Sequence, residues 1–156
     1  MHLLVVAVGQ RQPGWADLAW ADFAKRFPPD MRLELAAVKA EPRSSGKTAA
    51  QCMAAEATRL AAAVPRGARR LVLDENGQRC TTAQLAERMA FWRGDGRDLA
   101  LLIGGPDGLD AQIKASADET LRLSDLTLPH AFARVLLAEA LYRAWTLSTG
   151  HPYHRD

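Results

Sequence analysis

The sequence has little cysteine, few aromatic residues and almost no net charge. Its 156 residues include two cysteines and 6% aromatic residues, and the formal net charge is +2. Neither Cys52 nor Cys80 has a Cys or His neighbour at metal-ligand spacing, so we expect free thiols and no metal site. The net charge is too small for the overall field to indicate a nucleic-acid partner, and any such binding must come from a local patch.

Long apolar runs are also missing. No run reaches the roughly 20 apolar residues that a membrane span needs. The first residues, MHLLVVAVGQ, lack the basic region and the small-residue cleavage site of a secretory signal. We therefore expect a cytoplasmic protein without a membrane partner. With 48% apolar and 24% charged residues, the 156 residues fit one globular domain, residues 1–156, with a real core.

Short apolar runs alternate with segments of helical periodicity. The expected strands are Leu3–Val8, Leu33–Val38, Arg70–Asp74, Leu99–Gly105 and a segment Leu121–Leu128 that is strand and then loop. The expected helices are Trp15–Phe27, Thr48–Val64, Thr81 to about Trp92, a short helix capped by Asp110, and His130–Leu147. The polar segment Lys39–Lys47 is the best candidate for a mobile loop. Alternating strands and helices predict an α/β fold, a mostly parallel sheet with helices on both faces.

In open α/β sheets, ligands bind beyond the carboxyl ends of the strands. This rule nominates the loops after Val8, Leu73, Ile103 and Leu126. The third of these loops belongs to the stretch LLIGGPDG, Leu101–Gly108, which places glycines directly after a strand. Its spacing matches neither the dinucleotide fingerprint nor the P-loop, so we exclude both nucleotide classes. A tight turn and a loop that lets a ligand approach the backbone remain open.

Several long stretches of the chain carry a resemblance. They are LLIGGPDGL, LTLPHAFARVLLAEALYRAW and the ending HPYHRD, supported by LVVAVG near the start, RFP, LDENG and DGRDLALLIGG. Together they closely resemble the family of ribosomal RNA large subunit methyltransferase H, the pseudouridine N3-methyltransferases of the SPOUT class. The resemblance covers the whole chain, and residues 39–68 match least specifically.

The resemblance implies a SPOUT-type fold with a deep trefoil knot, the knotted donor-binding part spanning about residues 70–156. General topology rules would predict no knot. It also implies S-adenosyl-L-methionine as methyl donor and methylation of N3 of a pseudouridine in 23S rRNA. Because the sequence indicates no separate RNA-binding domain, we expect the substrate to be the large subunit or the whole 70S ribosome. The family further implies a homodimer in which one subunit's donor pocket is combined with elements of the other.

By the same resemblance, the donor contacts the ends of strands and one loop. The residues implied are Leu73, Gly104, Gly105, Leu123, Ser124, Asp125, Leu126, Thr127 and Leu128. We expect the absence of side chains at Gly104 and Gly105 to leave room for the donor. The backbone of Leu123–Leu128 would read the adenine edge.

The ending HPYHRD supplies the candidates for catalysis. A base near the target nitrogen would help its proton to leave, and His154 and His130 are the titratable candidates. His130 follows Pro129 at a helix start, which favours a capping or packing role, so we assign the base to His154. Arg155 would hold an RNA phosphate and Tyr153 would stack on a base. We expect this ending to add no core.

The last expected helix is apolar on nearly every face, with only Arg134, Glu139 and Arg143 charged. A helix that is apolar all round is buried, which favours a subunit interface, and a central place in one subunit's core is the alternative. Two groups of basic residues are candidate RNA patches, and each is also typical of a solvated surface. They are Lys39, Arg43 and Lys47, and Arg143, His151, His154 and Arg155.

Two other functions remain open. A knotted methyltransferase could act on another RNA, for example on a tRNA ribose 2′-hydroxyl, and the nucleotide that gains mass would distinguish it. A non-catalytic RNA-binding assembly factor would bind RNA without binding the donor.

Overall fold

The computed structural model describes residues 1–44 and 46–155, and its strands form one parallel sheet. The strands are β1 (His2–Val8), β2 (Arg32–Val38), β3 (Arg69–Leu73), β4 (Leu99–Ile103) and β5 (Glu119–Leu121). Their order across the sheet is β2-β1-β4-β3-β5, and every pairing is parallel. The predicted α/β class is therefore confirmed.

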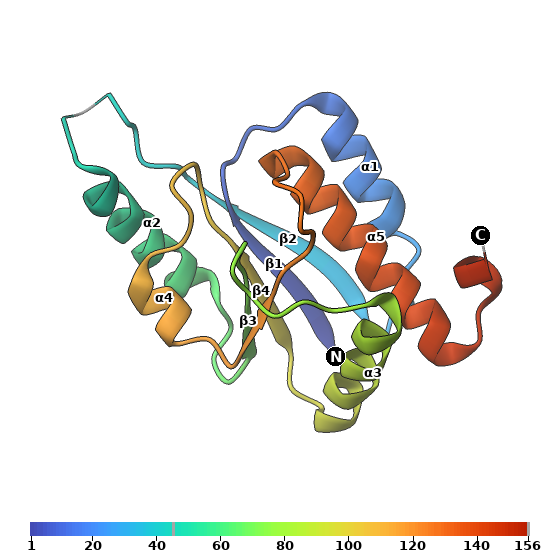
Figure 1. Ribbon diagram of the computed structural model, residues 1–156. Helices are drawn as coiled ribbons and strands as arrows, with labels where there is room; N and C mark the ends of the chain where they lie inside the picture. The colour runs from blue at the N-terminus through green and yellow to red at the C-terminus, as the bar shows by residue number, and fades with distance from the viewer. Residues whose placement is uncertain (45, 156) are drawn as a thin grey trace.

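Helices cover both faces of this sheet (Figure 1). They are α1 (Gly14–Ala24), α2 (Ala49–Ala63), α3 (Thr82–Asp95), α4 (Ala111–Ala115) and α5 (His130–Thr149), followed by a short 3-10 helix, η1 (Pro152–Arg155). On one face α1, α3 and α5 pack together, and on the other α2 lies beside α4. Each face has its own apolar core, because alternate strand residues such as Val5 and Val6 point to opposite sides. Within the described residues, no helix has the length and apolar character of a membrane span.

Side-chain caps explain where two of the helices begin. Thr81 accepts a hydrogen bond from the Gln84 amide, and the Gln84 side chain accepts from the Thr81 amide, which confirms the expected capping box. Thr48 and Gln51 form a second box of the same spacing, which the sequence analysis overlooked. The predicted Asp110 cap of α4 is also present.

Several predicted boundaries were wrong by a few residues. Helix α1 ends at Ala24 rather than Phe27, because the residues before Pro28 tighten into turns in which Arg26 and Phe27 bond three residues back. The fifth strand is Glu119–Leu121, so it ends at the residue where the sequence analysis began it. The chain then leaves the sheet, and the loop continues to Pro129.

Helix α5 has the central place in the core of one chain that the sequence left open as the alternative. Leu137, Leu141 and Ala144 are fully buried in the core of this one chain, between α1, α3 and the sheet. On the outer side, Phe132 is 48% exposed and Leu136 is 40% exposed. The helix is therefore a core helix that also carries an uncovered apolar stripe.

The segment that follows β3 passes across β5, and the two backbones are in direct contact. The Asp74 amide donates to the Leu121 carbonyl at 3.0 Å, and the Arg122 amide donates to the Gln78 carbonyl at 2.9 Å. A Cβ at Gly77 would lie 2.9 Å from the Leu121 carbonyl carbon. Only glycine allows two backbones to pass at this distance, and the crossing is therefore tight.

Candidate functional site

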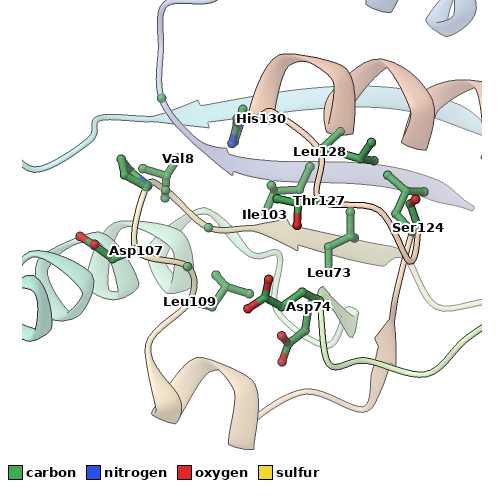
Figure 2. Close-up of a pocket in the computed structure, with 18 of the residues that line it drawn as sticks. Val8, Leu73, Asp74, Ile103, Asp107, Leu109, Ser124, Thr127, Leu128 and His130 are labelled. Atoms are coloured by element: carbon green, nitrogen blue, oxygen red, sulfur yellow. The ribbon is translucent and has the colours of Figure 1, made fainter.

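A cavity of about 660 Å³ opens at the carboxyl ends of β1, β3 and β4. Figure 2 shows Val8, Leu73 and Ile103, the last residues of these strands, around it, with the 123–128 loop on one side. Strand β1 leads to α1 and β2 on one side, whereas its neighbour β4 leads toward β5 on the other. Loops therefore diverge between β1 and β4 and leave a crevice there.

Most of the residues expected to hold the donor lie around this cavity. Those that line it are Leu73, Gly104, Gly105, Leu123, Ser124, Leu126, Thr127 and Leu128. Asp125 does not belong to the lining, and its carboxylate accepts from Arg79 Nε at 3.0 Å and from Arg122 at 3.3 Å. The Ser124 hydroxyl accepts from the Leu126 amide at 2.9 Å and so bends the loop.

The two glycines have a different purpose from the one expected. A Cβ at Gly104 would lie 2.5 Å from the carbonyl carbon of Gly108, and one at Gly105 would lie 3.1 Å from Glu56 Oε1. Both missing side chains face protein rather than the cavity. Gly104 is therefore needed to close the 104–108 turn, and Gly105 is needed to pack on a buried carboxylate.

The polar groups of the cavity are mainly acidic. Asp74, Glu75 and Asp107 line it, and Lys114 is the one lysine among the lining residues. The Lys114 ammonium is 3.3 Å from Asp74 Oδ2, so that pair is already balanced. Asp107 is paired with Arg43 at 3.0 Å, so Glu75 is the lining carboxylate for which the described residues show no ion pair. Its charge makes the cavity suited to a cationic ligand.

His130 faces Asp74 across the cavity (Figure 2). Its Nε2 accepts from Arg134 Nε at 2.7 Å, and the ring is also hydrogen bonded to the backbone of Gly104. Burial, followed by the nearby Arg134 cation, lowers the pKa of His130 to about 4, so the ring is neutral at physiological pH. These contacts correspond to the packing role expected for His130 and occupy the ring.

Several lining residues were missed by the sequence analysis. They are Gly9, Gln12, Asp74, Glu75, Asp107 and Lys114. Most of them sit in the loops that the strand-end rule had nominated, and Asp74 and Glu75 lie inside the LDENG stretch. Reading the charges of these loops together would have indicated the acidic character of the site. Lys114 lies on α4, outside any nominated loop, and no sequence signal pointed to it.

Two of the three basic residues of the 39–47 segment, Arg43 and Lys47, are paired within the protein. Arg43 donates to the buried Glu56 at 2.5 Å and is 3.0 Å from Asp107, while Lys47 is paired with Glu41. Arg59 reaches Glu41 at 2.6 Å. These cations lower the pKa of Glu41, Lys47 more than Arg59. Arg43 and Lys47 are therefore already balanced by carboxylates of their own chain, and their contact with RNA stays a prediction. Ser45 lies outside the described residues.

The ending of the chain folds back onto α5, and the expectation that it adds no core was wrong. The Tyr153 ring packs on Tyr142 with centroids 4.7 Å apart, and its hydroxyl donates to Glu139 at 3.1 Å. Burial and this carboxylate raise the pKa of Tyr153. His154 Nδ1 is buried with no hydrogen-bond partner in the part of the chain that the structure describes.

The expected catalytic residues and the cavity lie at opposite ends of α5. His130, at the first residue of the helix, lines the cavity, and η1 follows the last turn. A helix of 20 residues is about 30 Å long. The structure therefore does not bring Tyr153, His154 and Arg155 to the cavity of their own chain. Among residues 1–44 and 46–155, no group of three or more His, Cys, Asp or Glu side chains could hold a metal ion.

Comparison with known proteins agrees with this architecture. The family described as "Predicted SPOUT methyltransferase" matches residues 1–154. Ribosomal RNA large subunit methyltransferase H from Leptothrix cholodnii is 71% identical over 156 residues, and that from Methylibium petroleiphilum is 67% identical, each alignment covering 100% of both chains.

Solved structures share the fold at lower identity. The structure reported as "Structural insights into the 2-OH methylation of C/U34 on tRNA" has a TM-score of 0.50 at 24% identity, covering 94% of this chain and 92% of that one. A probable methylase family protein from Haemophilus influenzae has a TM-score of 0.53 at 14% identity, covering 99% and 70%. At these identities the likeness concerns the fold alone. The full-length relatives and the family match together show that the chain belongs to the SPOUT methyltransferases, in the family of ribosomal RNA large subunit methyltransferase H.

Proposed function

We propose that this protein transfers a methyl group from S-adenosyl-L-methionine to N3 of a pseudouridine in 23S rRNA. The observation that carries the proposal is the acidic cavity at the ends of β1, β3 and β4, lined by Leu73, Gly104 and the 123–128 loop. The donor is a sulfonium cation, and the carboxylate of Glu75 favours a positive ligand there. The names of the relatives that are 67–71% identical specify large-subunit rRNA as their substrate.

Methyl transfer requires the target nitrogen, the methyl carbon and the donor sulfur to be in line, and it requires a base that accepts the N3 proton. The donor supplies an electrophilic methyl group, and the N3 lone pair forms the new bond while the carbon–sulfur electron pair returns to sulfur. The N3 proton must pass to a base. Because His130 is engaged by Arg134 and Gly104, we assign that base to His154. Positioning of the two reactants supplies most of the rate enhancement.

Such an assignment requires two subunits. Helix α5 separates the ending of one chain from its own cavity by about 30 Å. If two α5 helices pack antiparallel around a two-fold axis, the ending of each chain lies beside the cavity of the other. We therefore propose a homodimer in which Tyr153, His154 and Arg155 of one subunit complete the site of its partner.

The exposed apolar residues support this pairing. Of the seven large hydrophobic side chains that are exposed in the described chain, five lie on α1 and α5. They are Trp15, Leu18, Phe132, Leu136 and Leu147. Trp15 and Phe132 are in ring contact at 4.8 Å, which makes the two helices one surface. Apolar patches of this kind mark protein interfaces.

We also propose that the crossing at β5 closes a trefoil knot. Residues 74–80 pass over β5 in backbone contact, and the chain then runs from Arg122 to α5 on the face that carries α3. If the chain is knotted, pulling the termini apart in a single-molecule experiment should tighten the knot. The extended chain would then be shorter than its residue number allows. Extension to the full unknotted length would contradict the proposal.

The substrate we propose is the assembled ribosome in the cytoplasm. The described residues form one sheet with its covering helices and no separate RNA-binding domain, and Arg43 and Lys47 are paired internally. A large preformed rRNA surface would compensate for this lack of a binding domain. Donor, protein and either 70S ribosomes or 50S subunits lacking the modification should be incubated, and the 23S rRNA analysed by mass spectrometry. We expect one pseudouridine to gain 14 mass units, the mass of a methylene, as a base modification.

Other outcomes would select the alternatives. Mass gained on a ribose, or on tRNA instead of rRNA, would indicate the knotted methyltransferase of different specificity. RNA binding without donor binding in a calorimeter would indicate the assembly factor. Either result would overturn the proposed function.

The shared site can be tested by complementation. Thr127→Trp should fill the cavity, because Thr127 lines it from an exposed loop position, and His154→Ala removes the proposed base. In a mixed dimer of these two chains, one of the two composite sites is intact. We therefore expect about half of the wild-type activity. If each site belonged to a single chain, the mixed dimer would be inactive.

A further inference from the structure

Arg134 is a buried cation beside the cavity. The proposed methyl transfer gives it no role. It lies on the first turns of α5 and is 3% exposed. Among the described residues, its guanidinium hydrogen bonds to neutral groups: the His130 ring, the Val8 carbonyl at 3.4 Å and the Gly9 carbonyl. Desolvation of a charge is costly unless its hydrogen bonds are well satisfied, so this placement calls for an explanation.

The contacts of Arg134 join three walls of the cavity. Gly9, which follows β1, has φ +112°, a conformation that favours glycine and turns its carbonyl to the guanidinium. His130 begins α5 and is bonded to the backbone of Gly104, which follows β4. Gly9 and His130, which Arg134 contacts, and Gly104, which His130 contacts, all line the cavity. The guanidinium therefore links the ends of β1 and α5 directly, and the end of β4 through the His130 ring.

The same contacts determine the tautomer of His130. Because Nε2 accepts the Arg134 Nε–H, the ring proton of the neutral form must be on Nδ1. The bond with the Gly104 backbone favours the protonated state of that nitrogen, which identifies the Gly104 carbonyl as the acceptor. Both ring nitrogens are thus used, and the ring presents no charge to the cavity.

We propose that Arg134 is a positioning residue that holds His130 as a neutral Nδ1–H imidazole and so keeps the cavity receptive to a cationic methyl donor. The inference rests on the proposed function, in which the cavity binds S-adenosyl-L-methionine. A protonated His130 would place a second cation in the donor site and repel the sulfonium. The demethylated product, S-adenosyl-L-homocysteine, has no charge on sulfur, so the same change would affect it less.

The charged groups around His130 come from every element that borders the cavity. On α5 this is Arg134, and on α1 Asp17 acts on Arg134 through its charge. Across the cavity are Asp74, Glu75, Asp107 and Lys114. The acidic groups would favour protonation of His130, whereas burial and Arg134 oppose it. Removing the guanidinium therefore shifts this balance toward the cationic ring.

The first test needs no ligand and no mutation. In wild-type protein, nitrogen chemical shifts of the His130 ring should show the Nδ1–H tautomer, and the ring should remain neutral from pH 8 to pH 5, because its pKa is about 4. The free imidazole prefers the other tautomer, so a residue that merely packs would not give this signature. An Nε2–H tautomer, or titration near pH 6.5, would overturn the proposal.

The second test measures affinities of donor and product by calorimetry between pH 8 and pH 5. In Arg134→Gln, which can still donate to the Gly9 carbonyl, we expect donor affinity relative to product affinity to fall about threefold to tenfold as His130 becomes protonated. In wild type and in Arg134→Lys, which keeps the charge, the ratio should stay constant. In the double variant Arg134→Gln, His130→Asn, the pH dependence should disappear.

These measurements distinguish failure of the proposed role of Arg134 from failure of the proposed function. A pH dependence that persists in the double variant, or a constant ratio in a folded Arg134→Gln, would refute the role of Arg134. Failure of wild type to bind either ligand at pH 8 would refute the proposed function, while the nitrogen shifts would still report on Arg134. If Arg134→Gln does not fold, the measurements on wild type decide the question.

Discussion

The two ends of α5 differ in how far one chain satisfies its own polar groups. At the cavity end, Arg134 and both nitrogens of His130 are hydrogen bonded within the chain. At the other end, Tyr153 is bonded to Glu139, but His154 Nδ1 is buried without a partner among the described residues. The cavity end, where we propose that the donor binds, is therefore satisfied within one chain. The other end, which we propose contacts the substrate, has a polar group that the described chain leaves without a partner.

The largest effect should come from a substitution that prevents the 104–108 turn at the cavity end from adopting its conformation. In Gly104→Ala, the added methyl would lie 2.5 Å from the Gly108 carbonyl carbon, a distance that forces the 104–108 turn to move. We expect more than about 100-fold loss of donor affinity and destabilisation by about 2 to 4 kcal/mol. Calorimetry and urea unfolding would measure the two effects.

Gly94→Ala is the matched control for this change. Gly94 lies in α3, and a Cβ there would meet nothing within 4 Å. Replacing it should leave donor affinity unchanged and stabilise the helix by about 0.5 to 1 kcal/mol. If Gly104→Ala behaved like Gly94→Ala, the turn would not be as tight as the structure indicates.

The second effect concerns the rate and belongs to the far end of α5. His154→Ala should lower the single-turnover rate at saturating RNA about 100-fold, since a positioned base typically contributes at least this much. Donor affinity should change less than twofold, because His154 is not among the residues that line the donor cavity, and in the proposed dimer it faces the target nitrogen of the RNA. Rapid-quench measurements with labelled donor would give the rate.

The result would separate catalysis from binding. An unchanged single-turnover rate with weaker RNA binding would mean that His154 only holds the substrate. A large loss of donor affinity in His154→Ala would contradict the assignment of His154 to the RNA substrate.

The elements of the fold were predictable because their signals are local. The run Leu3–Val8, the Thr81 capping box and the Asp110 cap act through neighbours in sequence, and the structure confirms each. Boundaries depend on tertiary contacts, and these were less accurate. Strand β5 is three residues long and is defined by pairing with β3 rather than by its own pattern. A single sequence does not show such a pairing.

The site was only partly predictable for a similar reason. The strand-end rule and the resemblance together identified Leu73, Gly104 and the 123–128 loop, which line the cavity. The purpose of Gly104 was misread, because its contact with Gly108 depends on how the turn closes. The pairing of Arg43 with Glu56 and Asp107 joins three segments that are far apart in sequence. Charge partners of this kind are invisible without coordinates.

The third effect tests whether the ending is structural as well as catalytic. Truncation after Gly150 removes the Tyr153 ring from Tyr142 and its hydroxyl from Glu139. We expect the chain to remain a folded dimer that binds the donor and has lost methyl transfer. The free energy of unfolding should fall by about 1 to 3 kcal/mol. Sedimentation, calorimetry and urea unfolding would check these expectations.

Tyr153→Phe is the graded control for the truncation. It keeps the ring and removes one hydrogen bond, which should cost about 1 kcal/mol. A truncated chain as stable as wild type would show that the packing of η1 contributes nothing. Full activity of the truncated chain on ribosomes would show that the ending is not part of the site at all.

The smallest effect should come from Arg155, the exposed cation of the ending. If it contacts one phosphate, Arg155→Ala should weaken ribosome binding a few-fold and reduce the dependence of log K on log salt by about 0.7 to 0.9. Stability and donor affinity should stay unchanged, since the side chain contributes to neither the cavity nor the packing of Tyr153. Arg66→Ala, which removes an exposed arginine between α2 and β3, controls for the loss of one charge from the whole protein. If the dependence of log K on log salt changed equally in both variants, the effect would be due to net charge. A change in Arg155→Ala alone would place a phosphate contact at the end of α5 where His154 Nδ1 has no partner among the described residues.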